Sequence, residues 1–336
     1  MQAARIYSPA VVESNPLVIE ELPNPQPGIG QVRIKVSMCG VCHTDLHIVE
    51  GEIHPPHLPV TPGHQVVGVI DAIGNLSESL PSLKLGQRVG VPWLYSTCGN
   101  CEFCVRGEEN LCASAQFTGF HVNGGFAEYM LADARFVLPL PDTVSDEQAA
   151  PLLCAGIVGY RSLKRAEIQS GEKVGLFGFG ASAHLCIQVL RYWGCPVYVF
   201  TRSRAHQDHA RDLGAAWAGE AGSSGASTLD RAVIFAPVGE LVPTALEKIR
   251  PGGTIAINAI HMSDIPSFPY RTIYGERTLR SVANATYRDG VDFLDLAVKA
   301  GIQSSVNLYP LKDANQALRD LKASTFNGEA VLVVGT

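Results

Sequence analysis

The stretch "VGLFGFGASAHLC", residues 174–186, determines the fold predicted for this chain. A short apolar run ends in a turn that contains Gly178 and Gly180, and the residues that follow have the apolar spacing of a helix. Small residues in such a turn let the backbone approach a pyrophosphate, which then lies against the free N–H groups of the helix N-terminus. The stretch therefore predicts a strand–turn–helix unit that binds a dinucleotide through Gly178, Gly180, Ala181 and Ala183.

The residues around and after this stretch alternate between apolar runs and helical patterns. Strands that alternate with helices pair in parallel, so this part of the chain predicts a doubly wound parallel sheet with helices on both faces. Further strands are expected at 196–201, 231–237, 254–260 and 278–284, with a helix at 203–214 and a surface loop at 219–228.

The first half of the chain has a different pattern. Short apolar runs broken by Pro and Gly, such as "QVRIKVSMCG" (31–40) and "GGFAEYMLAD" (124–133), are typical of a largely antiparallel β domain. A helical pattern begins near residue 146. The predicted fold class is therefore α/β with two domains: a mostly antiparallel β domain at 1–156, completed by 289–336, and a parallel-sheet domain at 157–288.

Composition and charge exclude several classes of protein. Of the 336 residues, 46% are hydrophobic and 17% charged, as in an ordinary globular protein with a large core. The net charge of −6 provides no basic surface for nucleic acid, and no apolar run reaches the roughly 18 residues of a membrane-spanning helix. The first residues lack the basic and apolar segments of a secretory signal. We therefore expect a cytoplasmic protein in which the nine cysteines stay reduced.

Four of these cysteines stand close together in "CGNCEFCVRGEENLC" (98–112). Thiolates at this spacing can converge on one tetrahedral zinc ion, and four of them leave no position for water or substrate. The pattern predicts a structural zinc site rather than a catalytic one. Unligated surface thiols and an iron–sulfur cluster are the alternatives. The four residues are Cys98, Cys101, Cys104 and Cys112.

Three other residues are candidates for an open metal site: Cys42, His64 and Cys154. Two thiolates and one imidazole leave the fourth tetrahedral position free, as expected of zinc that oxidises alcohols. Spacing alone does not establish this site, because cysteines far apart in the sequence are often just buried apolar residues.

Several motifs, taken together, identify a family. "CGVCHTDLH" (39–47), "PGHQVVGVI" (62–70), the four-cysteine loop, "LCAGIVGY" (153–160) and "GFGASAH" (178–184) occur in this order. The chain resembles, over essentially its whole length, the zinc-dependent alcohol dehydrogenases of the medium-chain dehydrogenase/reductase family, its bacterial members in particular. The resemblance implies a GroES-like catalytic domain, a Rossmann domain, and hydride transfer between a primary alcohol or aldehyde and NADP(H) or NAD(H).

The resemblance also implies roles for individual residues. Cys42, His64 and Cys154 match the ligands of the catalytic zinc, one of two zinc ions per subunit. Asp45 matches a carboxylate that holds the histidine ligand. Thr44 matches the hydroxyl that binds the substrate oxygen, and His47 the outer end of a proton relay. Cys39 is expected to be a small core residue. Trp93 matches a wall of the substrate pocket, and the apolar Ile48 is a further candidate for that wall.

The end of the second Rossmann strand predicts the cofactor preference. An enzyme specific for NAD would place an acidic residue near Thr201, and none is present. Two guanidinium groups and two hydroxyls instead suit a 2′-phosphate, which predicts a preference for NADP(H) over NAD(H). The alternative is that the arginines are ordinary solvated turn residues. The predicted residues are Thr201, Arg202, Ser203 and Arg204, with Arg288 as a further phosphate contact.

Three positions depart from the family pattern. Gln65 stands where relatives usually carry glutamate after the zinc histidine, a side chain thought to approach the metal during ligand exchange. Val158 replaces a threonine expected against the nicotinamide, and Tyr287 stands where relatives carry a phosphate-binding arginine. These departures keep two other functions open: a catalytically weak nucleotide-binding redox sensor, and a zinc-free quinone or enone reductase. The resemblance further implies a dimer or tetramer of the chain; it does not identify the substrate or the direction of reaction.

Overall fold

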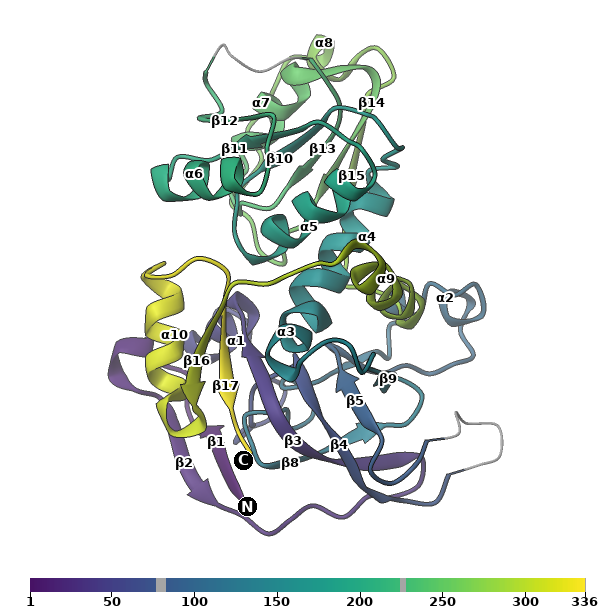
Figure 1. Ribbon diagram of the computed structural model, residues 1–336, viewed down its shortest axis with the longest axis vertical. Coiled ribbons are helices and arrows are strands. Elements are labelled where there is room, and N and C mark those ends of the chain that lie inside the picture. Colours follow the sequence, from purple (N-terminus) through teal and green to yellow (C-terminus); the bar gives the residue numbers. More distant parts are fainter. Residues whose placement is uncertain (77–82, 224–227, 336) are drawn as a thin grey trace. The chain divides into compact units, whose positions relative to one another are not determined.

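The computed structural model describes residues 1–76, 83–223 and 228–335, and part of the loop predicted at 219–228 lies outside this range. The chain divides into two compact units (Figure 1). The first comprises Met1–Cys154, Asn284–Val298 and Ser304–Thr336, and the second Ala155–Ala283 and Lys299–Gln303. Of the described residues, none belongs to a helix long and apolar enough to cross a membrane.

The second unit is built on a parallel sheet of six strands (Figure 1, teal and green). Counted along the chain, its strands have the order three, two, one, four, five, six, which is the order of a Rossmann fold. Across the sheet they are β12 (Trp217–Gly219), β11 (Val197–Phe200), β10 (Val174–Phe177), β13 (Leu229–Ile234), β14 (Ile249–Ile257) and β15 (Thr278–Ser281). The helices of this unit are α4 (Ile157–Arg165), α5 (Ala181–Tyr192), α6 (Arg204–Asp212), α7 (Leu241–Lys248) and α8 (Tyr270–Ile273).

The turn between β10 and α5 requires glycine at its first position. Gly178 has a φ of +93°, and a Cβ atom there would lie 2.8 Å from the backbone nitrogen of Ala236. Gly180 is different, because its φ is −101° and a Cβ atom would meet nothing within 4 Å. The backbone conformation of the turn therefore requires glycine at position 178. Position 180 has no such requirement, and the missing side chain of Gly180 leaves open space beside the turn.

The first unit contains a larger, mostly antiparallel sheet. Across it run β16 (Val306–Pro310), β17 (Glu329–Val333), β3 (Gln31–Val41), β4 (Val66–Ile73), β5 (Arg88–Val91) and β9 (Leu138–Pro139), and β8 (Tyr129–Asp133) also pairs with β3. Two small sheets pair β1 (Gln2–Ile6) with β2 (Leu17–Glu21) and β6 (Leu94–Ser96) with β7 (Gln116–Phe117). The α-helices are α1 (His43–Glu50), α2 (Glu102–Val105), α3 (Asp146–Pro151), α9 (Tyr287–Ala300) and α10 (Ala314–Lys322).

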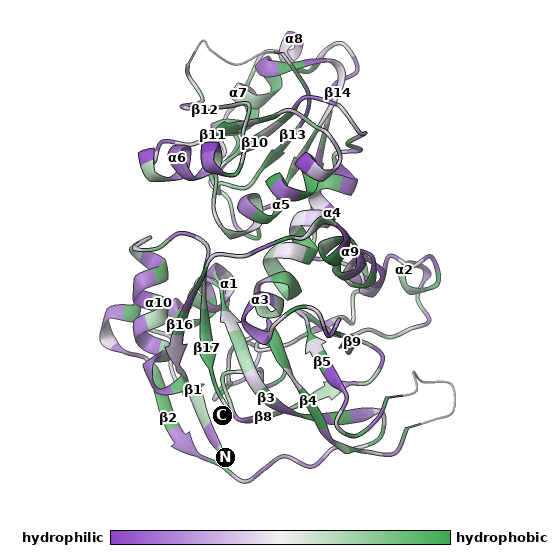
Figure 2. Ribbon diagram, viewed as in Figure 1, coloured by the Kyte–Doolittle hydropathy of each residue, from purple (hydrophilic) through white to green (hydrophobic). Residues whose placement is uncertain are grey.

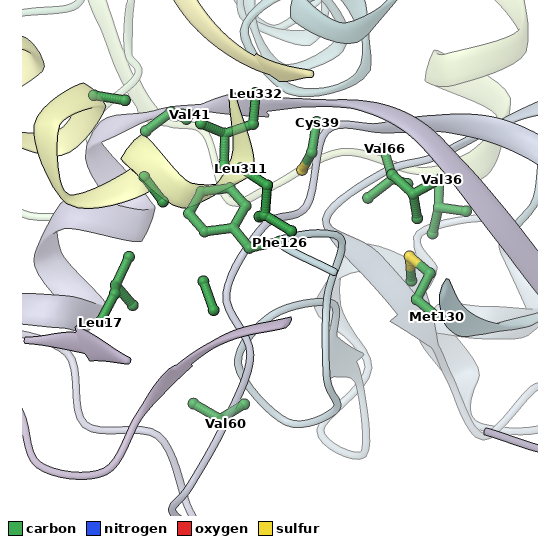
Figure 3. Packing of buried hydrophobic residues seen from close by; sticks show 14 of the residues in the cluster. Leu17, Val36, Cys39, Val41, Val60, Val66, Phe126, Met130, Leu311 and Leu332 are labelled. Atoms are coloured by element: carbon green, nitrogen blue, oxygen red, sulfur yellow. The ribbon is translucent and has the colours of Figure 1, made fainter. Parts of the chain in front are cut away.

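The core of the first unit lies against one face of this sheet. Cys39 and Val41 of β3 and Leu332 of β17 point into it (Figure 3). Side chains on a strand alternate between faces, so these apolar residues fill one face and their neighbours in sequence face the other way. In Figure 2, β4 and β17 of the first unit and β10, β11 and β13 of the second are mostly hydrophobic, whereas β16 and part of β2 are hydrophilic. The predicted α/β fold with one antiparallel and one parallel sheet is thus confirmed, and Cys39 is a core residue as predicted.

Ile48 corrects one expectation. It was a candidate for the wall of the substrate pocket, but its side chain is fully buried and belongs to the same core cluster. The reason is its place on α1, whose buried residues also include Leu46 and Val49. Ile48, which follows the motif "CGVCHTDLH", therefore belongs to the buried face of α1.

Candidate active site and metal centres

Three metal-binding side chains from distant parts of the sequence meet in the first unit. The donor atoms of Cys42, His64 and Cys154 all lie within 4.8 Å of one another. Nε2 of His64 is 3.2 Å from Sγ of Cys42. His64 is fully buried, and both cysteines are partly buried.

Each of these residues lies at or next to the end of a helix or strand. Cys42 follows β3 and caps the N-terminus of α1, where its sulfur accepts a hydrogen bond of 3.3 Å from the Thr44 N–H. His64 precedes β4. Cys154 lies in a π-helical segment, Leu152–Gly156, that follows α3. π-Helical turns are rare and are often found at functional sites.

The helix that precedes Cys154 is anchored by polar contacts within the first unit. Nε of Arg88 donates a hydrogen bond of 2.7 Å to Asp146, the first residue of α3. Asp146 also accepts a hydrogen bond from the hydroxyl of Ser37 on β3. The side-chain amide of Gln148 exchanges two hydrogen bonds with the backbone of Ser304. These contacts limit the positions that Cys154 can adopt.

Asp45 orients both ends of the site. Its Oδ1 accepts hydrogen bonds from Nδ1 of His64 at 3.1 Å and from the N–H of Gly63 at 3.0 Å, and its Oδ2 accepts one from the N–H of Cys42 at 3.1 Å. The side chain has no exposed surface. Because Nδ1 of His64 donates to this carboxylate, Nε2 carries the free lone pair that a metal requires.

The chemistry of the three donors fits zinc. Tetrahedral bonds of about 2.3 Å to sulfur and about 2.0 Å to nitrogen place S and N roughly 3.5 Å apart, close to the observed separation. The hydrogen bond with Cys154, together with burial, raises the pKa of the Cys42 thiol well above its usual range. A cation bound between the two sulfurs would instead lower the pKa of Cys42, because a cation stabilises the thiolate. Three donors leave one position of the tetrahedron open.

The four-cysteine loop forms a second cluster in the same unit. The sulfur of Cys98 is 3.9 Å from that of Cys104 and 3.5 Å from that of Cys112, and the sulfurs of Cys101 and Cys104 are 3.5 Å apart. Tetrahedral Zn–S bonds of about 2.3 Å predict edges of about 3.8 Å. Backbone N–H groups of Asn100 and Cys101 lower the pKa of Cys98 to about 6, which favours the thiolate. The four donors complete a tetrahedron and leave no place for substrate.

Thr44, His47 and Trp93, the other predicted catalytic and pocket residues, lie in the same unit as the open site. Thr44 and His47 are three residues apart on α1, so their side chains lie on the same face of this helix. Nδ1 of His47 pairs with the carboxylate of Glu52, which leaves Nε2 available. The ring of Trp93 meets the ring of His64 edge-on, with a centroid distance of 4.8 Å. Trp93 therefore contacts one of the proposed metal ligands.

The predicted cofactor residues lie in the second unit, except Arg288, which lies on α9 of the first unit. Ala183 is buried, and Gly180 is the exposed N-cap of α5. At the end of β11, Thr201 is half-buried; the three residues that follow it, Arg202, Ser203 and Arg204, are exposed. Ser203 caps α6 by accepting a hydrogen bond of 3.3 Å from the N–H of His206. Neither Arg202 nor Arg204 has a carboxylate partner within the described part of the chain.

Known proteins are similar to this chain in sequence. Residues 28–142 match the family model "Alcohol dehydrogenase GroES-like domain". The "Probable alcohol dehydrogenase AdhA" of Mycobacterium tuberculosis is 41% identical over 99% of this chain and 97% of its own length. This chain belongs to the zinc-type medium-chain alcohol dehydrogenase family. As a member of that family it is an oxidoreductase. An alcohol dehydrogenase of Geobacillus stearothermophilus is 34% identical over 97% of this chain and 99% of its own length.

Solved structures of alcohol dehydrogenases have the same fold. The cinnamyl alcohol dehydrogenase SbCAD4 of Sorghum bicolor superposes with a TM-score of 0.88 at 26% identity, covering 98% of this chain and 97% of its own. The alcohol dehydrogenase of the archaeon Aeropyrum pernix gives a TM-score of 0.85 at 28% identity, over 99% of this chain and 100% of its own.

The departures from the family pattern occupy defined places. Gln65 is fully buried and its side chain lies over Gly40, where a Cβ atom would come within 2.8 Å of Nε2. Val158 is half-buried on α4. Tyr287 donates its N–H to Glu109 in the four-cysteine loop, at 2.8 Å. The exposed Arg288 pairs with Asp292 at 2.7 Å, one turn further along α9.

Two features of the site were missed in the sequence. Phe117 stacks on Trp93 with a centroid distance of 5.0 Å, and Phe120 lies 6.0 Å from it. The string "QFTGFH" that follows the cysteine loop contained this signal, because aromatic residues in a short loop must pack against something. The second feature is Glu329, whose side chain is fully buried; burial raises its pKa well above its usual range, and the Cys42 thiol raises it further. No motif pointed to this residue.

Proposed function

We propose that this chain is a zinc-dependent alcohol dehydrogenase or aldehyde reductase, which moves hydride between a primary alcohol or aldehyde and NADP(H) or NAD(H). The observation that carries the proposal is the convergence of the donor atoms of Cys42, His64 and Cys154 within 4.8 Å, with Asp45 bound to the far side of the imidazole. A zinc-free reductase would have no need for this arrangement. A nucleotide sensor would have no need for the hydroxyl and imidazole on the neighbouring helix.

The three donors would hold one zinc ion per subunit, and the four cysteines of the loop a second. When bound, the catalytic zinc would supply Lewis-acid polarisation of the substrate oxygen, and the nicotinamide would accept or give the hydride. Asp45 holds the tautomer of His64, and the anchored helix α3 holds Cys154. The loop with four cysteines has a structural role.

The chain itself supplies the proton path. As the oxygen of the Thr44 hydroxyl accepts the proton of a substrate alcohol, the hydroxyl releases its own proton toward the imidazole of His47. Nε2 of His47 takes up that proton and then gives it to solvent, because Nδ1 is held by Glu52. In the reverse direction the same groups return a proton to the oxygen of the reduced aldehyde. Trp93, with Phe117 and Phe120 packed on it, excludes water from one side of the metal donors and favours an apolar substrate.

The second unit would bind the cofactor. The turn at Gly178, Gly180, Ala181 and Ala183 suits the pyrophosphate, and Thr201, Arg202, Ser203 and Arg204 suit a 2′-phosphate, with Arg288 as a further contact. The exposed guanidinium groups of Arg202 and Arg204, which have no carboxylate partner in the described chain, support a preference for NADP(H); Arg288 pairs with Asp292. The domain boundaries 1–156, 157–288 and 289–336 remain a prediction. We further propose a cytoplasmic homodimer or homotetramer that binds neither membranes nor nucleic acid.

The experiment is an absorbance assay of nicotinamide reduction or oxidation with a panel of primary alcohols and aldehydes. We expect turnover by the purified chain, faster with NADP(H) than with NAD(H), and loss of turnover in Cys42→Ala. Cys195→Ala is a control, because Cys195 is a buried cysteine of the second unit outside both metal clusters. Turnover that survives Cys42→Ala would favour the zinc-free reductase, and absence of turnover with every substrate would favour the sensor.

A further inference from the structure

Glu329 is a buried carboxylate on β17. Its side chain has 1% exposed surface, and neither Oε1 nor Oε2 has a partner among the described residues. Its backbone is held firmly, since its N–H donates a hydrogen bond of 2.9 Å to the carbonyl of Ser305 and β16 pairs with β17 in parallel. An ionised carboxylate buried without a partner is costly, so this group stays protonated unless a cation compensates its charge.

The register of the sheet places Glu329 beside the open metal site. The pairing of β17 with β3 ends at Ala330 and Val41, and the same register continued by one residue would set Glu329 opposite Cys42. Directly opposed residues have Cβ atoms about 4.5–5.5 Å apart.

Gln65 lies on the same face of the sheet. Gly40 pairs with Val331 and receives the side chain of Gln65, so this amide faces away from the core, as Glu329 does. Neither Nε2 nor Oε1 of Gln65 has a hydrogen-bond partner among the described residues. A buried amide and a buried carboxylate, both without hydrogen-bond partners in the described part of the chain, therefore occupy the same side of β3 as Cys42.

We propose that Glu329 is an additional oxygen ligand of the metal held by Cys42, His64 and Cys154. Its carboxylate fills the fourth position when no substrate oxygen does, and it retains the metal in the resting protein. A carboxylate oxygen is an ordinary zinc ligand, and the three donors leave one place for it. Because the carboxylate is not part of the cluster of donors within 4.8 Å, it reaches the metal by rotation of its side chain. This inference rests on the proposed function.

The test compares metal release from the full-length protein and from Glu329→Gln. Zinc loss to excess EDTA is followed by elemental analysis, and the visible spectrum is recorded after exchange with Co²⁺. We expect one zinc equivalent to leave about 10–100-fold faster in Glu329→Gln, while the equivalent in the four-cysteine loop leaves at an unchanged rate. The Co²⁺ bands of the open site should shift. Asp71→Asn is the matched control, because Asp71 lies on β4 but pairs with Arg33.

A second variant moves the carboxylate rather than removing it. In the double variant Gln65→Glu with Glu329→Gln, the charge stays on the same face of the sheet, and we expect slow zinc release to return. Equal release rates and equal Co²⁺ spectra for the protein and Glu329→Gln would overturn the inference. A different result would contradict the proposed function itself: the zinc content of Cys42→Ser would equal that of the unaltered protein.

Discussion

Nδ1 of His64 and Oδ1 of Asp45 lie 3.1 Å apart, and neither side chain has any exposed surface. This contact turns the other nitrogen of the imidazole toward Cys42. Asp45 also accepts the N–H of Cys42, so one carboxylate holds two of the three proposed ligands. The site is therefore preorganised by a residue that is itself not a donor.

The variant Asp45→Asn tests this role. The amide nitrogen that replaces one carboxylate oxygen accepts no hydrogen bond, so the N–H groups bound by that oxygen, of either Cys42 or Gly63, lose their acceptor, and His64 loses its charged partner. We expect zinc affinity of the open site to fall about 10–100-fold, measured by competition with a chelator. Glu50→Gln is the control, because Glu50 lies on the same helix and binds Lys322 instead. Equal zinc affinity in Asp45→Asn and the unaltered protein would contradict this role.

The two glycines of the cofactor turn should respond differently to alanine. Gly178→Ala forces a side chain into a left-handed backbone and against Ala236, so we expect the free energy of unfolding to fall by about 1–3 kcal/mol. Gly180→Ala should leave thermal stability unchanged but weaken cofactor binding, because its methyl group would occupy the space proposed for the pyrophosphate. Calorimetry and cofactor titration separate the two. Tight cofactor binding by Gly180→Ala would remove this turn from the proposed site.

The arginines at the end of β11 should determine the choice of cofactor. We expect Arg204→Ala to raise KM for NADP(H) about 10-fold or more with little change for NAD(H), since a charge-assisted hydrogen bond contributes about 1.5–3 kcal/mol. Arg211→Ala is the control, because Arg211 on the same helix pairs with Asp208 and donates to the carbonyl of Ala218. A lower KM of the unaltered protein for NAD(H) than for NADP(H) would show that the arginines are solvated turn residues.

His184 on α5 should make stability depend on pH. Burial, together with His209, lowers the pKa of His184 to about 4. The unfolded chain takes up this proton below about pH 6.5 and the folded chain only near pH 4, so stability falls as the pH falls between these values. The difference amounts to about 3 kcal/mol. His184→Leu should lose this dependence, as measured by denaturation at pH 7 and pH 4.5, whereas His206→Leu, at a less buried position, should change it less. Parallel pH profiles for the protein and His184→Leu would contradict the shift.

The proposed ligands and the cofactor turn were predictable because each lies within a short motif. "CGVCHTDLH" combines the helix cap, its ligand and the carboxylate in one string, and the glycine turn joins a strand to a helix. The predicted strands of the parallel sheet were found for the same reason, since their buried runs are continuous.

Glu329 was not predictable, because its position depends on pairing between strands nearly 300 residues apart in sequence. Local patterns carry no information about such a register. Ile48 was misjudged for a related reason: only the packing of α1 shows which side of the helix is buried. The π-helical segment at Cys154 has no sequence signal either.

The most direct test of the account is the zinc content of the purified protein, measured by elemental analysis in the unaltered chain and in two variants. We predict two equivalents per chain, one after Cys42→Ser with loss of turnover, and one after Cys98→Ser with a lower melting temperature. A single equivalent in the unaltered protein, or a zinc content that Cys42→Ser does not change, would contradict the claim that one ion has a structural role and the other a catalytic one.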